Sequence, residues 1–196
     1  MAVTIRRRLV LAAVLVGLLR VPGPAAAIVP ALAPADVEEA LETGRQAVVQ
    51  EDFGDEWRIA LPDGGEIVVS TPFSRLAQAA RQAALKGEPL NDKQRQEHID
   101  RGKGKIQLLV TMYGRTVDFA RWYQPVLKVA GREVKPTFTQ NERTALKLDD
   151  GRFAARNVYV FPLEGVPPRG TVTLVVRHTV EQKEVMRAPV DLSKMR

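Results

Sequence analysis

The 196-residue sequence contains no cysteine and only two histidines. The absence of cysteine excludes disulfide bridges, thiolate metal sites, a cysteine nucleophile and a lipidated cysteine. The two histidines, His98 and His178, lie 80 positions apart and match no metal-ligand spacing. We therefore predict neither a metal site nor a bound cofactor.

Motifs of the common catalytic classes are also missing. The sequence has no G-x-S-x-G nucleophile elbow and no phosphate-binding P-loop. Acidic residues are dense at 51–56 and at Asp149–Asp150, but each segment has the composition of an exposed loop or turn. A pair of carboxylates hydrolyses glycosides only when both lie in one cleft, which closeness in sequence does not establish. The sequence thus favours a protein without catalytic activity.

Long hydrophobic runs are absent, since the uncharged apolar run over 9–19 has 11 residues. As a helix it would cover about 16 Å of a hydrocarbon core that is roughly 30 Å thick. Arg6–Arg8 precede this run, and Ala25–Ala27 follow it with small side chains. This order predicts a signal peptide over 1–27, cleaved after Ala27. We expect export to the periplasm or out of the cell, with no transmembrane anchor after cleavage.

The net charge of +6 depends largely on the predicted signal peptide, which holds four arginines and no acid. Cleavage would leave a net charge of +2, too small for a dedicated nucleic-acid binder. The remaining charge is uneven, with −4 over 28–105 and +6 over 106–196. Opposite signs in the two halves predict contact between them.

Residues 28–104 are predicted to form helices and a β-hairpin. Apolar spacing indicates a helix over 34–50, weakened by about 1 kcal/mol at Gly44 relative to alanine. A hairpin is expected over 57–70. The next helix carries the clearest signals, a threonine N-cap followed by proline, and a closing glycine, over 71–87. A short helix and a loop are expected over the polar segment 91–104.

Residues 105–196 contain a series of short runs with the apolar alternation of strands, separated by turn residues. The predicted strands are 106–112, 117–123, 126–129, 134–138, 144–148, 153–161, 171–178 and 185–190. Strands of this number and length are typical of an antiparallel β-sandwich, and without a cysteine pair the likeness is to the broad immunoglobulin-like architecture. We therefore predict an α+β protein, in which N-terminal helices and a β-hairpin precede an immunoglobulin-like β-sandwich domain over 105–196.

Two groups of residues are candidates for contact with a ligand or partner. On the predicted strand 117–123, Arg121 and Tyr123 share a face and could stack on a sugar ring or on a partner's side chain. The alternative is that the aromatic residues of this strand fill the core. Lys103 and Lys105 belong to a basic, glycine-containing stretch that could contact an anion, or simply form a solvated loop.

These features together favour an exported, non-catalytic protein of the cell envelope that binds another envelope protein or takes part in an assembly. A carbohydrate- or cell-wall-binding module, contacting glycan through Arg121 and Tyr123, is the second hypothesis. A carboxylate-based hydrolase is the third hypothesis. It ranks last, because function has to be argued from a site and the sequence displays none.

Overall fold

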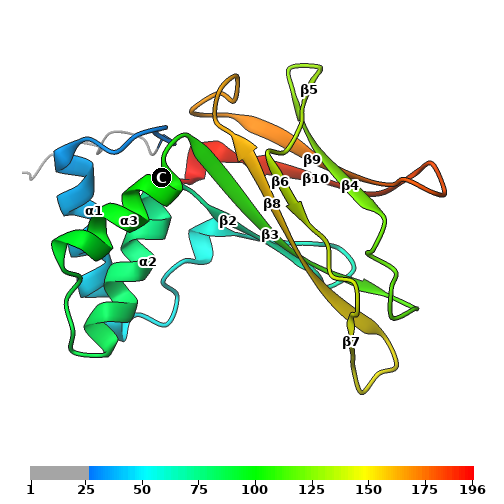
Figure 1. The fold of residues 1–196 in the computed structure, drawn as a ribbon, viewed down its shortest axis with the longest axis horizontal. Coiled ribbons are helices and arrows are strands. Elements are labelled where there is room, and N and C mark those ends of the chain that lie inside the picture. The colour runs from blue at the N-terminus through cyan, green and yellow to red at the C-terminus, as the bar shows by residue number, and fades with distance from the viewer. Residues whose placement is uncertain (1–26) are drawn as a thin grey trace, which may run out of the picture.

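The computed structural model describes residues 27–196, so the predicted signal peptide lies outside the described residues except for Ala27. The described chain is α+β, with three α-helices gathered at one end of two antiparallel sheets (Figure 1). The helices are α1 (Pro34–Gln46), α2 (Pro72–Leu85) and α3 (Asp92–Gly102). None of the helices within residues 27–196 is long and apolar enough to cross a membrane.

The signals predicted at the ends of α2 are confirmed. The Thr71 side chain accepts a hydrogen bond from the Ser74 backbone N–H at 3.0 Å, and Ser74 Oγ accepts one from the Thr71 N–H at 2.9 Å. Pro72 occupies the first helical position, where its missing N–H costs nothing. After the helix, Gly87 has a φ of +70°, a conformation that glycine adopts without strain.

The larger sheet has six strands, in the order β1-β2-β3-β8-β6, with β7 also paired to β8. Its strands are β1 (Arg58–Ala60), β2 (Glu66–Ser70), β3 (Lys105–Gly114), β6 (Phe138–Gln140), β7 (Leu146–Lys147) and β8 (Phe153–Pro162). The smaller sheet has the order β10-β9-β4-β5. Its strands are β4 (Tyr123–Val129), β5 (Arg132–Val134), β9 (Thr171–His178) and β10 (Lys183–Asp191).

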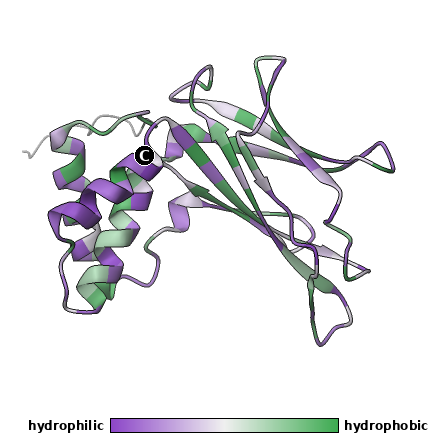
Figure 2. Ribbon diagram, in the orientation of Figure 1, coloured by the Kyte–Doolittle hydropathy of each residue, from purple (hydrophilic) through white to green (hydrophobic). Residues whose placement is uncertain are grey.

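One core joins the two sheets and the helices. Buried and partly exposed residues alternate along β3, and Figure 2 shows hydrophobic and hydrophilic residues alternating along the strands. The core includes Leu108 and Phe161 from the larger sheet, Leu174 from the smaller sheet, and Leu76 from α2. Two antiparallel sheets that share an inner core form a sandwich. The predicted α+β class with an immunoglobulin-like β-sandwich is confirmed.

The predicted strand 117–123 is wrong, because residues 117–122 form a turn and Tyr123 is already the first residue of β4. The Phe119 ring folds back over Gly114, where an added Cβ would lie 2.2 Å from Phe119 Cγ. The Arg121 N–H then donates to the Asp118 carbonyl at 3.0 Å within the turn. A residue larger than glycine at 114 would leave no room for this reversal.

The predicted strand 134–138 is divided between the two sheets. Val134 ends β5 in the smaller sheet, whereas Phe138 begins β6 in the larger one. Pro136 lies between them and has no N–H to donate to a strand ladder. The chain rejoins a sheet where the Thr137 N–H donates to the Val160 carbonyl at 2.7 Å.

The predicted division after residue 104 runs through a single sheet, since β2 pairs with β3 and Val69 lies opposite Leu108. Among the described residues, Arg196 forms the ion pairs that join the basic half to the acidic half. It contacts Asp36 and Glu39 of α1. The other ion pairs of the described residues are local to one half. Apolar packing and strand pairing, rather than charge, therefore account for most of the contact between the halves.

Candidate functional site

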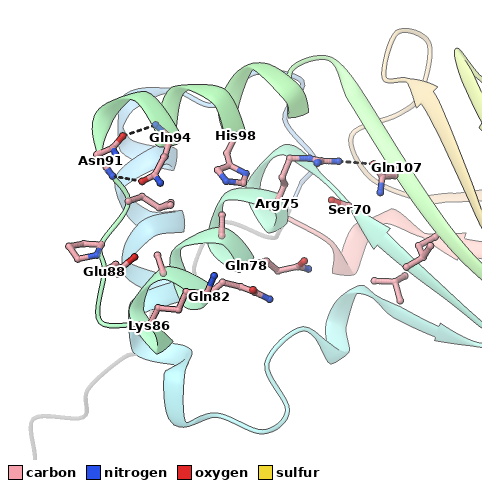
Figure 3. A pocket seen from close by; sticks show the side chains of 16 residues that line it. Ser70, Arg75, Gln78, Gln82, Lys86, Glu88, Asn91, Gln94, His98 and Gln107 are labelled. Carbon is pink, nitrogen blue, oxygen red and sulfur yellow. Dashed lines mark hydrogen bonds between the residues drawn. The ribbon is translucent and has the colours of Figure 1, made fainter.

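A groove lies between the helices and the outer face of the larger sheet. The alternation that buries Ile67 and Leu108 turns Val68 and Leu109 toward the opposite face, where they lie beside each other in register. The second sheet covers the inner face of the sandwich, so it leaves this outer face open. Helices α2 and α3 form the wall, from which Arg75 of α2 reaches toward Gln107 of β3 and His98 of α3 points toward α2 (Figure 3).

Three adjoining hollows make up this helix–sheet groove. The first, of ≈ 660 Å³, lies between α2, α3 and strands β2 and β3. The second, of ≈ 430 Å³, shares Arg75 and Gln107 with the first and reaches Phe138 of β6. The third, of ≈ 390 Å³, shares Val68 and Leu109 with the first and extends toward β1. The shared residues make the groove continuous along the sheet.

Arg75 of α2 lies where the first two hollows meet. Its Nη2 donates a hydrogen bond to Gln107 Oε1 of β3 at 2.9 Å (Figure 3). No carboxylate of the described residues lies within ion-pairing distance of its guanidinium group. Partial burial, followed by the positive charge of Arg101, lowers the pKa of Arg75 from its ordinary value. A half-buried cation is thus held in place by a neutral amide.

Positive charge dominates the helix–sheet groove, whose lining includes seven lysines and arginines but two acids, Glu66 and Glu88. Glu66 is engaged by Arg58, with an oxygen 2.9 Å from Nη1. The imidazole of His98 on α3 lies near two of these cations, Arg101 and Arg75. Partial burial, then the charges of Arg101 and Arg75, lower its pKa from the ordinary value. The groove is therefore suited to an anionic ligand.

Some polar groups of the groove already have partners. The side chains of Asn91 and Gln94 exchange hydrogen bonds with each other's backbone N–H groups at the start of α3, at 2.9 and 3.0 Å (Figure 3). Arg81 donates to the backbone carbonyls of Ala47 and Gln50 at 2.9 and 2.7 Å. These hydrogen bonds hold the walls of the groove together. Arg75, at the meeting point of the first two hollows, is instead hydrogen-bonded to the neutral side chain of Gln107.

Of the residues that the sequence singled out, Lys105 lines the second hollow. Lys103 is exposed just after α3 and does not line the groove. Lys105 and Gln107 come from β3 and Arg75 comes from α2, so two elements bring these residues to the second hollow.

Arg121 and Tyr123 do not share a strand face, because Arg121 lies in the turn before β4. The exposed Arg121 stacks over Trp122, with its guanidinium carbon 5.2 Å from the ring centroid. Tyr123 is half-buried against Phe119 and His178, at centroid distances of 6.0 and 5.9 Å. Burial, with a smaller contribution from a neighbouring glutamate, raises the pKa of Tyr123 to about 12. Neither Arg121 nor Tyr123 lines the helix–sheet groove.

The acidic segments considered for catalysis lie at the surface. Residues 51–56 form turns between α1 and β1, and their acids are exposed. Asp150 accepts a hydrogen bond from the Arg152 N–H at 2.9 Å and pairs with its side chain, which lowers the pKa of this carboxyl. A general acid requires the opposite shift. Within residues 27–196, no three histidine or acidic side chains are grouped as metal ligands.

Sequence reasoning missed Arg75, Gln107 and Phe138, which the fold brings to one hollow. Arg75 and Gln78 fall on the polar side of the predicted alanine-rich helix, a pattern that is ordinarily a solvated face. Gln107 is an outward position of a strand with apolar alternation. These signals were present, but they do not indicate that the two surfaces face each other.

The chain matches no family model, and no curated protein matches it. Among solved structures, the C1 domain of an IgNAR antibody superposes with a TM-score of 0.31 at 13% identity, covering 52% of this chain and 83% of that domain. A protein of unknown function from Burkholderia pseudomallei K96243 superposes with a TM-score of 0.42 at 7% identity, covering 84% of this chain and 92% of the other.

Proposed function

We propose that this protein is an exported, non-catalytic binding protein of the cell envelope, and that its helix–sheet groove binds an acidic segment of a partner protein. The observation that carries the proposal is the excess of positive charge in a continuous groove where half-buried Arg75 has a neutral partner. Partially buried cations are normally paired, so an unpaired one in a concave surface favours an external counter-charge.

The floor of the groove supports a protein segment rather than a free ion. Val68 and Leu109 are half-buried on the outer sheet face, and Val158 extends the same row on β8. Phe138, with 50% of its surface exposed, lies beside Val160 in the next row. Apolar residues within a basic rim fit a ligand that carries both apolar and acidic side chains.

Site-specific photo-cross-linking in the host's envelope tests this proposal. The photoreactive residue p-benzoylphenylalanine is introduced at Gln78 or Leu109 in the groove, and at Val180, which is 68% exposed in the β9–β10 turn, as the matched control. We expect a protein adduct from the two groove positions, with the cross-linked peptide rich in Asp and Glu. Arg156→Glu in the groove should abolish the adduct, whereas Arg132→Glu on β5 should not.

Three outcomes would refute the proposal: equal adducts at Val180, no adduct at the groove positions, or a cross-linked peptide without acidic residues. Adducts to glycan instead of protein would favour a cell-wall-binding module. The exposed Arg121–Trp122 stack keeps that second candidate open, because an aromatic ring beside a cation is a common platform for sugars. Co-sedimentation with purified peptidoglycan that is lost in Trp122→Ala would support it.

A further inference from the structure

We propose that Arg75, Arg101 and Lys105 form an oxyanion site in the second hollow of the helix–sheet groove, where a carboxylate or phosphate group borne on an apolar moiety is bound. This inference rests on the proposed function and deepens it, because it names the part of the groove that recognises the ligand's charge.

The composition of the hollow is the first argument. Eight residues line its ≈ 430 Å³: three bases, no acid, and the neutral residues Gly102, Gln107, Thr137, Phe138 and Val160. The three cations come from α2, the last turn of α3 and the first residue of β3. Like charges around one hollow repel one another, and a bound anion relieves that repulsion.

Pre-organisation is the second argument. Gln107 Oε1 accepts one hydrogen bond from Arg75, which leaves further guanidinium donors in a planar fork that matches an oxyanion. Because Gln107 uses its oxygen toward Arg75, its amide N–H₂ is the group that remains to donate. Gly102 permits the close approach of α3 to α2, since an added Cβ would lie 3.1 Å from Pro72 Cα.

Charge compensation within the protein is weak, which is the third argument. Among the described residues, Glu97 is the carboxylate that pairs with one of the three cations, with an oxygen 3.6 Å from Arg101 Nη2. Both side chains of that pair are exposed, and such pairs contribute little. Burial first, and then the neighbouring arginine charges, lower the pKa values of Arg75 and His98.

The apolar wall defines the remainder of the ligand. Phe138 and Val160 are direct neighbours across β6 and β8, and Phe138 is half exposed. A ligand whose anionic group contacts Arg75 would place its adjoining atoms against this pair. An acidic side chain, a chain-terminal carboxylate next to an apolar residue, and a phosphorylated aromatic group all have this chemistry.

Titration of the purified protein with small anions, followed by NMR at constant ionic strength, tests the site. The probes are phenyl phosphate, phenylacetate and inorganic phosphate, with benzyl alcohol as the neutral control. We expect the two aromatic anions to bind more tightly than inorganic phosphate, and the alcohol not to bind. Stronger binding of phenylacetate would assign the site to carboxylates, and stronger binding of phenyl phosphate would assign it to phosphate groups.

Arg75→Gln should weaken the binding of the better probe roughly 10-fold or more, the loss expected for charge-assisted hydrogen bonds to one guanidinium group. Arg132→Gln on β5 is the matched control and should bind as the wild type does. Binding should also raise the pKa of His98, because a bound anion offsets the neighbouring arginine charges. Equal affinity of Arg75→Gln and wild type, equal losses in both variants, or the absence of binding at tens of millimolar probe would each overturn the site.

The two proposals fail in different ways. Anion binding that depends on Arg75, together with no partner cross-linked from Gln78 or Leu109, would retain the oxyanion site and remove the protein-binding function. Cross-linking to an acidic partner, together with anion affinity that is indifferent to Arg75, would retain the groove and remove this assignment.

Discussion

Gly44→Ala should destabilise the protein, although alanine is the better helix former. Gly44 lies in α1 at its contact with α2. An added Cβ would lie 2.1 Å from the Ala77 carbonyl oxygen and 2.8 Å from the Ala80 Cβ, both in α2. Because the first of these neighbours is backbone, the two helices must move apart to admit the methyl group.

The magnitude follows from two opposed effects. Alanine in place of glycine favours a helix interior by about 1 kcal/mol. Overpacking of a close contact typically costs about 1–3 kcal/mol, and here the helix separation also stretches the Arg81 hydrogen bonds to Ala47 and Gln50. We expect a net loss of about 1–2 kcal/mol in the free energy of unfolding. For a protein of this size, that lowers the Tm by about 2–8 °C.

Thermal unfolding followed by circular dichroism measures this change. Thr43→Ala is the control, because it adds a helix-favouring alanine to the neighbouring position of α1, and its Tm should equal or slightly exceed that of wild type. A Gly44→Ala protein with a Tm at or above the wild-type value would refute the close-contact argument. The glycine would then be a simple weakness of the helix.

Two further predictions concern buried and titratable side chains. The Tyr159 hydroxyl is buried without a hydrogen-bond partner among the described residues, so Tyr159→Phe should leave the Tm unchanged or raise it by a few degrees; a fall of several degrees would contradict this. His98 has a lowered pKa in the folded state, so the unfolded state binds more protons as the pH falls through about 6.5. The Tm of wild type should therefore fall from pH 7.5 to 5.5 more than that of His98→Gln, and equal slopes would disprove the assignment.

The ends of α2 could be predicted from the sequence because their causes are local. A threonine cap, a proline at the first position and a closing glycine act within a few residues of one another, and all three lie where they were expected. The turn before β4 could not be predicted in this way. The run of apolar and aromatic residues over 117–123 is typical of a strand, but the fold of Phe119 over Gly114 depends on packing between side chains that the run does not reveal.

The candidate site was less predictable than the fold, because its residues converge only in three dimensions. Arg75 and Gln107 are 32 positions apart, and Phe138 is further along the chain. The basic stretch in the sequence indicates Lys105 as a candidate, but the place of Lys105 in the hollow depends on the start of β3 lying beside α2. A basic stretch in the sequence therefore indicated one residue of the hollow, but not the position of the hollow itself.

Arg75 and Arg81 show how a site can be told from a structural contact on the same helix. Both arginines are partly buried on α2, and both lie in the groove lining. Arg81 is satisfied by two backbone carbonyls and stacks on the Phe53 ring at 5.0 Å, so its role in holding α1 and α2 together needs no ligand. Arg75 instead has a neutral amide partner and a second cation nearby. A guanidinium group has five N–H donors, and the described residues accept one hydrogen bond from Arg75, which leaves donors for a ligand. The contrast between two residues six positions apart is therefore a stronger reason to look for an anion at Arg75 than the basic character of the groove alone.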